Sequence, residues 1–146
     1  DDIYLALRGL KTMELRLKQS FASSLIVAEW LSNVPIISKV LHPGLKSHPD
    51  YKIFNKDYKL GAGLFAFELK TKDLKKVDRF IDSLNLFGIG ASWGGFESLI
   101  LEADLEQIRD HKTFKDGTLI RLAIGLEDPN DLINDLSSAF KTEPRE

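Results

Sequence analysis

The first 32 residues carry the strongest folding signal in the sequence, a series of apolar side chains at spacings of three and four. The series is Ile3, Leu7, Leu10, Met13, Leu17, Phe21, Leu25, Ala28 and Leu31. This spacing is typical of one face of a helix, and Pro35 disfavours helix at the residue before it. We therefore predict a helix over Asp1–Ser32. At about 1.5 Å per residue it would be about 48 Å long. Since that exceeds the width of a small domain, we expect its first turns to pack on a part of the protein absent from this sequence.

The rest of the sequence alternates between short strand patterns and short helix patterns. We expect strands at 36–41, 64–69, 87–92, 98–101 and 119–124, helices at 50–58, 73–83 and 128–140, a helix or loop at 105–110, a turn at 115–117 and a frayed tail at 142–146. Asp73 and Asp128 stand where helix caps are needed, and Pro129 suits a first helical position. This order predicts an α+β domain, with a mixed or antiparallel sheet covered by helices on one side.

The composition removes several classes of function. The 146 residues include 20 basic and 22 acidic ones, so the net charge of -2 gives no support for a nucleic-acid partner. The absence of cysteine excludes disulfides and thiol catalysis in this sequence. No apolar run approaches the roughly 20 residues that cross a bilayer, and no signal peptide is visible. The histidines His42, His48 and His111 are too few and too scattered to predict a metal site.

Arg121 is the first candidate for a functional residue. It interrupts the apolar strand at 119–124, where Leu119, Arg121 and Ala123 point to one face and the intervening residues to the other. A buried charge must be paired, and a guanidinium suits a carboxylate held through two hydrogen bonds. The partner is either a ligand carboxylate or an Asp or Glu of this protein, and the pattern leaves both open.

The second candidate is the turn Ser92-Trp93-Gly94-Gly95. Paired glycines permit backbone angles closed to other residues and allow a ligand to approach the main chain. Ser92 offers a hydroxyl and Trp93 a flat apolar wall. The alternative reading is a tight turn whose tryptophan belongs to the core, and the pattern alone does not separate the two.

Several motifs in order resemble the Cys/Met-metabolism family of pyridoxal-phosphate (PLP) enzymes. They are Arg8-Gly9-Leu10-Lys11-Thr12-Met13, His42-Pro43-Gly44-Leu45, Gly63-Leu64-Phe65-Ala66-Phe67-Glu68-Leu69 and Arg121-Leu122-Ala123-Ile124-Gly125-Leu126-Glu127-Asp128. The resemblance covers essentially the whole sequence. It implies the small C-terminal domain of aspartate-aminotransferase-like enzymes (PLP fold type I). Here this would be a single substrate-closing domain over 1–146, which closes over a cofactor held by a larger upstream domain.

Within the family, Ser92-Trp93-Gly94-Gly95 is most similar to the bacterial cystathionine β-lyase branch, whereas γ-synthases and γ-lyases typically have leucine in place of Trp93. The resemblance implies a cytoplasmic carbon–sulfur lyase of transsulfuration and methionine biosynthesis. Its reaction would be α,β-elimination of cystathionine to homocysteine, pyruvate and ammonia. One departure stands out, since the β-lyase pattern has a tyrosine where this sequence has Ala91. A γ-synthase or γ-lyase domain, or a free-standing ligand-binding or regulatory module, stays as an alternative.

The resemblance also assigns roles to residues. Arg121 would bind the substrate α-carboxylate, and Ser92 and Trp93 would line the same pocket, with Ser92 near the cofactor–lysine linkage. The Schiff-base lysine and the phosphate-binding residues would lie upstream, so this segment would contain no catalytic residue, hold no PLP by itself and be inactive alone. The full enzyme is expected to be a homotetramer.

Overall fold

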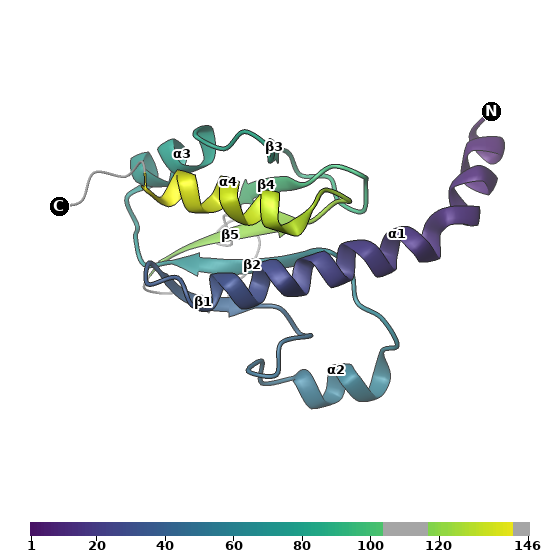
Figure 1. The fold of residues 1–146 in the computed structure, drawn as a ribbon, viewed down its shortest axis with the longest axis horizontal. Helices are drawn as coiled ribbons and strands as arrows, with labels where there is room; N and C mark the ends of the chain where they lie inside the picture. The colour runs from purple at the N-terminus through teal and green to yellow at the C-terminus, as the bar shows by residue number, and fades with distance from the viewer. Residues whose placement is uncertain (104–116, 142–146) are drawn as a thin grey trace, which may run out of the picture.

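The computed structural model describes residues 1–103 and 117–141. In chain order the elements are α1 (Asp2–Leu31), β1 (Ile37–Leu41), α2 (Tyr51–Asp57), β2 (Leu64–Leu69), α3 (Leu74–Asp82), β3 (Gly88–Ile89), β4 (Leu99–Glu102), β5 (Thr118–Ala123) and α4 (Pro129–Lys141) (Figure 1). The helix or loop predicted at 105–110, most of the turn at 115–117 and the tail at 142–146 lie outside the described residues. The other predicted helices and strands are present, most with ends within one or two residues of the prediction.

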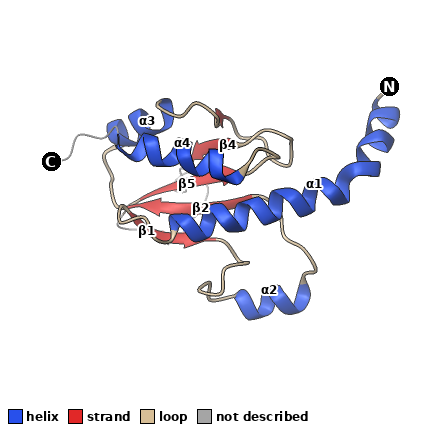
Figure 2. Cartoon of the chain, viewed as in Figure 1, coloured by secondary structure: helices blue, strands red, loops and turns tan. Residues whose placement is uncertain are grey.

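The five described strands form one sheet in the order β1-β2-β5-β4-β3. The pairs β1–β2, β2–β5 and β4–β5 are antiparallel, and β3 runs parallel to β4. Helices α1 and α4 lie side by side over one face, and α3 packs beside α4 (Figure 2). The predicted α+β architecture, a mixed sheet with helices on one side, is therefore confirmed.

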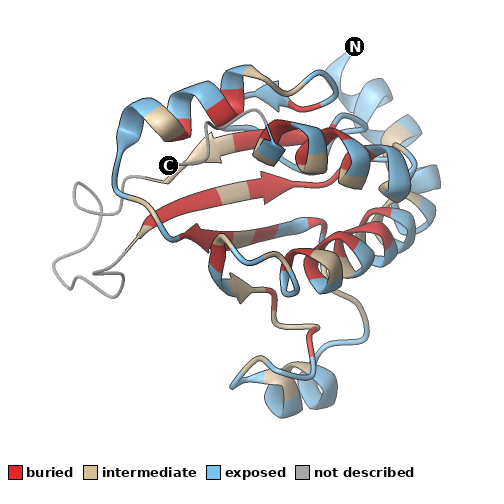
Figure 3. Cartoon of the chain, turned by 60° about the vertical axis from the view of Figure 1, so that its left-hand side comes forward, coloured by how far each residue is buried: buried red, intermediate tan, exposed pale blue. Residues whose placement is uncertain are grey.

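The core lies between that sheet face and the helices. Alternate residues of the central strands, such as Phe67 of β2 and Ile120 of β5, are fully buried against Leu31 of α1 and Leu136 of α4. Figure 3 shows this burial along the strands and the inner sides of the helices, while α2 stays largely exposed. Among the described residues, no helix is long and apolar enough to cross a lipid bilayer.

The predicted strand at 87–92 is wrong in length, because β3 contains only Gly88 and Ile89. Its main chain pairs with β4 through Gly88 N–H to Ser98 O (3.0 Å) and Gly90 N–H to Ile100 O (3.3 Å). Beyond Ile89 the carbonyl groups turn toward the Arg121 side chain instead of a neighbouring strand. The strand therefore ends at Ile89, three residues before the predicted end at 92.

The predicted helix over Asp1–Ser32 is confirmed, but its apolar face is covered only in the second half. Val27, Ala28 and Leu31 are fully buried, whereas Ile3 and Leu7 are mostly exposed. The first turns of α1 extend beyond the edge of the sheet (Figure 1). The periodicity thus predicts the helix correctly, and the apolar side chains of its first turns have no cover among the described residues.

His42 joins α1 to the loop after β1. Its side chain is 1% exposed and lies between the rings of Phe21 and Phe65. Its Nδ1 accepts the Gly44 N–H (3.0 Å), so the proton is on Nε2, which lies 2.9 Å from Ser24 Oγ. Burial lowers the pKa of His42 to about 4, and the charge of His48 acts in the same direction. His42 is a structural residue, and no cluster of metal ligands is present among the described residues.

We predict that His42 makes folding stability depend on pH between about 6.5 and 4. The unfolded chain binds a proton at His42 in this window and the folded chain does not, so stability is full above pH 6.5 and falls toward pH 4. A shift of this size is worth up to about 3 kcal/mol. Urea unfolding across this window should show a weaker pH dependence in His42→Gln than in the unchanged chain and in His48→Gln. Equal slopes in all three would contradict the assignment.

Candidate functional site

Arg121 stands in the middle of β5, on the sheet face opposite the helical core. The register places it between Ala66 of β2 and Leu101 of β4, while its neighbours Ile120 and Leu122 are fully buried on the core side. Strand alternation therefore puts the one charged side chain of β5 on the face without the core helices. The sequence-based prediction that Leu119, Arg121 and Ala123 share a face agrees with this register.

The guanidinium of Arg121 binds three consecutive main-chain carbonyls. Its Nη2 donates to Gly90 O (2.8 Å) and Ser92 O (3.0 Å), and its Nη1 donates to Ala91 O (2.9 Å). An internal ion pair, one of the two alternatives left open by the sequence, is not found among the described residues. The positive charge is instead stabilised by the negative ends of three peptide dipoles, and this fixes the start of the Ser92–Gly95 turn.

The same guanidinium keeps donor capacity for a ligand. A guanidinium has five N–H groups, and three of them are used by the carbonyls. Its Nε is buried and has no hydrogen-bond partner among the described residues. Leaving a buried donor unpaired costs about 1–3 kcal/mol, so an acceptor at this position would recover that energy. A carboxylate is the acceptor that a guanidinium binds best.

The turn places Ser92 and Trp93 beside this arginine. Gly94 has φ of 77°, a region that favours glycine, so the glycine at this position is required by the backbone. Trp93 is 64% exposed, which makes the core-tryptophan alternative wrong. The Ser92 side chain is also exposed, and it has no hydrogen bond within the described residues. Ser92, Trp93 and Arg121 are thus brought together through the Ser92 carbonyl, with both side chains of the turn open to solvent.

The turn is part of a longer segment, residues 85–98, which we call the 85–98 loop. Its two ends are bound by acidic residues that the sequence did not mark as candidates. Asp135 of α4 accepts the main-chain N–H groups of Asn85 (3.0 Å to Oδ1) and Leu86 (2.8 Å to Oδ2). Glu127, just after β5, binds Ser98 at the other end. In the sequence both resemble ordinary acidic residues at the start and on the face of a helix. Only the folded chain places them against a loop 29 to 50 residues away.

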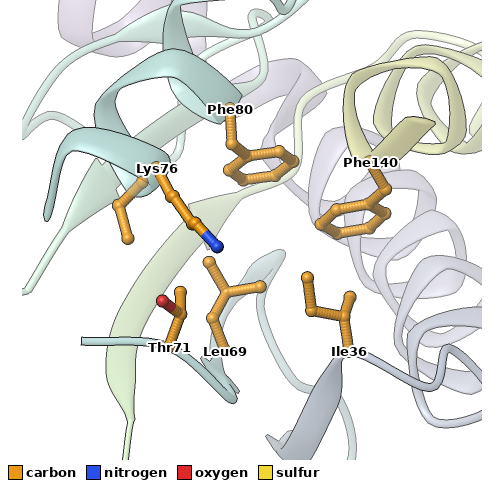
Figure 4. A pocket seen from close by; sticks show the side chains of 7 residues that line it. Ile36, Leu69, Thr71, Lys76, Phe80 and Phe140 are labelled. Atoms are coloured by element: carbon orange, nitrogen blue, oxygen red, sulfur yellow. The ribbon is translucent and has the colours of Figure 1, made fainter. Parts of the chain in front are cut away.

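Two hollows elsewhere lack the features of a ligand site. The first, between the ends of β2, α3 and α4, has a volume of about 10 Å³ and is lined mainly by apolar side chains (Figure 4). Phe80 and Phe140, which both line it, stack on each other with ring centroids 4.6 Å apart. The second, about 550 Å³, lies between α2 and residues 58–62, and Asp50 is its one charged lining residue. Neither hollow collects several polar groups that point to one ligand atom.

Comparison with known proteins finds relatives that match nearly the whole of this chain. The cystathionine beta-lyase of Escherichia coli is 42% identical over 145 residues, which are 96% of this chain and 37% of that protein. An L-alanine/L-glutamate racemase of Wolbachia pipientis is 39% identical over 146 residues, 98% of this chain and 36% of that protein. The chain thus spans a little over a third of the length of the curated relatives it matches.

Structural comparison leads to the same group. The chain aligns with a crystal structure from Campylobacter jejuni, assigned as an O-acetylhomoserine (thiol)-lyase, with a TM-score of 0.79 and 33% identity, covering 95% of this chain and 32% of that one. That protein holds N'-pyridoxyl-lysine-5'-monophosphate. The predicted fold, the α+β small domain of PLP fold type I enzymes, is confirmed. The sequence model of one protein family, the Cys/Met metabolism PLP-dependent enzymes, matches residues 1–141, and the chain therefore belongs to that family.

Proposed function

We propose that this chain is the C-terminal, substrate-closing domain of a PLP-dependent carbon–sulfur lyase of the cystathionine β-lyase type. The observation that carries the proposal is Arg121, whose guanidinium is fixed by three carbonyls and whose buried Nε–H has no partner in the part of the chain that the structure describes. The Ser92-Trp93-Gly94-Gly95 turn, which resembles the β-lyase branch, lies against the same guanidinium. The β-lyase of Escherichia coli among the relatives supports this reading.

In the proposed reaction Arg121 binds the α-carboxylate of cystathionine. The carbonyls of residues 90–92 hold the guanidinium plane in place before substrate arrives, so little side-chain freedom is lost on binding. A charge-assisted hydrogen bond contributes about 1.5–3 kcal/mol. Two such bonds also fix the direction of the bound amino acid, and this orientation sets which bond at its Cα can break.

Ser92 and Trp93 complete the proposed pocket wall. Both side chains are exposed and the Ser92 carbonyl is held by Arg121, so they can meet a substrate without rearrangement of the sheet. Trp93 would contact the apolar part of cystathionine. The Ser92 hydroxyl, which is free in the described residues, would face the cofactor–lysine linkage of the full enzyme.

The residues described here fit the carboxylate end of an amino acid rather than the cofactor itself. The described hydrogen bonds of Arg121 involve only main-chain carbonyls, and no lysine side chain takes part in them. PLP would serve the reaction as an electron sink. We infer that its lysine and its phosphate-binding residues belong to another part of the protein. The exposed side chains of Ile89, Trp93 and Phe96 suit a surface that meets that part. The homotetramer and the cytoplasmic location implied by the resemblance stay predictions.

An amino-acid racemase is a second candidate. The Wolbachia relative carries that name and covers nearly all of this chain. Ala91 replaces the tyrosine expected in the β-lyase motif, so a substrate contact of that tyrosine is missing. Racemisation needs removal and return of the Cα proton and no leaving group, and the carboxylate anchor at Arg121 would serve it equally well.

We predict that the full-length protein containing this chain releases pyruvate from L-cystathionine when PLP is supplied. The γ-branch alternative would give 2-oxobutyrate instead, and the racemase alternative would give D-alanine from L-alanine. Coupled assays for these three products, on one preparation, separate the readings. Absence of pyruvate together with either of the other products would overturn the β-lyase proposal.

We predict that Arg121→Lys in the full-length protein lowers kcat/KM about tenfold or more. Lysine keeps the charge but cannot bind the three carbonyls and a carboxylate with one planar group. Arg79→Lys, which makes the same exchange at an exposed position of α3, is the matched control and should leave kcat/KM unchanged. Unchanged kinetics in Arg121→Lys would remove the carboxylate-anchor role.

We predict that the 146-residue chain alone neither binds PLP nor catalyses the reaction. Mixing the purified chain with PLP should give the spectrum of the free cofactor, and gel filtration should separate the two. A visible absorption band that travels with the protein and resists dialysis would contradict this expectation. The full-length protein, treated in the same way, is the positive control.

A further inference from the structure

The carboxylate of Glu127 grips Ser98 with both oxygens. Its Oε1 accepts the Ser98 main-chain N–H at 2.7 Å, and its Oε2 accepts the Ser98 hydroxyl at 2.8 Å. Ser98 is 0% exposed, so this pair works where water competes little. Hydrogen bonds to a charged acceptor are among the stronger ones in proteins. Glu127 therefore fixes both the backbone and the side chain of the residue that ends the 85–98 loop.

A second set of contacts holds residues 125–127 close to the end of the 85–98 loop. Gly125 N–H donates to Ser98 Oγ (2.9 Å), and Leu126 N–H donates to Phe96 O (2.8 Å). A Cβ on Gly125 would overlap the Phe96 carbonyl oxygen and come within 2.6 Å of Glu127 Oε2. The approach is therefore possible only because position 125 is glycine. Ser98 Oγ accepts from Gly125 and donates to Glu127, so its hydrogen has one direction.

The two ends of the turn are thus held by opposite charges, one within β5 and one just after it. Arg121 holds the carbonyls of residues 90–92, and Glu127 holds Ser98. Ser92 and Trp93 lie between these anchors in the sequence, and both side chains are exposed. Their position relative to Arg121 depends on both anchors.

We propose that Glu127 is a positioning residue of the substrate site, acting through Ser98 to keep Ser92 and Trp93 in register with the Arg121 guanidinium. This inference rests on the function proposed above. Glu127 does not touch substrate in this scheme. Without its hydrogen bonds to Ser98 the turn can move. A shift of about 1 Å at such a site can lower the reaction rate on the order of a hundredfold.

The test compares Glu127→Gln, Glu127→Ala and Ser98→Ala with Asp131→Asn in the full-length protein. Asp131 is an exposed acidic residue in the first turn of α4 with no side-chain bond to the loop, so its change matches the loss of charge alone. We expect Glu127→Ala to lower kcat/KM about tenfold to a hundredfold, mainly by raising KM. Glu127→Gln keeps one acceptor oxygen and should lose less, and Asp131→Asn should behave as the unchanged protein.

Hydrogen-exchange mass spectrometry of the peptide covering 90–98 supplies a readout that does not depend on activity. Faster exchange in this peptide with the rest of the domain unchanged is expected in both Glu127 variants and in Ser98→Ala. If Glu127→Ala fails to fold, Glu127→Gln and Ser98→Ala carry the test. A lower melting temperature with KM and local exchange equal to those of Asp131→Asn would overturn the positioning role. If none of the three products forms even in the unchanged protein, the proposed function fails, while the exchange data still decide whether Glu127 anchors the loop.

Discussion

The bond set between the Arg121 guanidinium and the carbonyls of residues 90–92 is the interaction on which the candidate site depends. It ends β3 after two residues, because the carbonyls that would continue the sheet accept from an arginine instead. It also provides acceptors for three of the five N–H groups of a cation whose neighbours on β5 are apolar. Without those carbonyls Arg121 would be a partly buried charge in need of a counter-ion. One contact thus explains the short strand, the course of the turn and the stability of the charge.

The same principle recurs at each end of the loop. Asp135 accepts the N–H groups of residues 85 and 86, Arg121 donates to three carbonyls, and Glu127 binds Ser98. Each of these charged side chains binds main-chain groups of opposite polarity. A loop with few buried side chains gains order in this way, because hydrogen bonds between its main chain and charged side chains replace the side-chain packing that it lacks. Such a loop can expose Trp93 and Phe96 and still keep a defined course.

The local patterns of the sequence predict most of the fold. Helices α1, α3 and α4 follow from apolar spacing and from the caps at Asp73 and Asp128, which accept the N–H groups of Lys75 and Asn130. The site follows only in part. Arg121 stands out as a charge in an apolar strand, but its binding to carbonyls depends on residues some 30 positions away. The exposure of Trp93 could not be read from the sequence, since an aromatic residue beside glycines suits a core turn and an exposed wall equally well.

Many of the exposed apolar side chains lie in two parts of the chain that matter for its proposed role. One is the first half of α1, where Ile3 and Leu7 continue the stripe that packs on the sheet further along. The other is the 85–98 loop, where Trp93 and Phe96 are exposed and where Arg121 binds the carbonyls of residues 90–92. A self-sufficient binding module would bring apolar walls and polar groups together around its ligand. In the proposed function Arg121 would be the polar anchor and Trp93 one wall, and a second domain would complete the site.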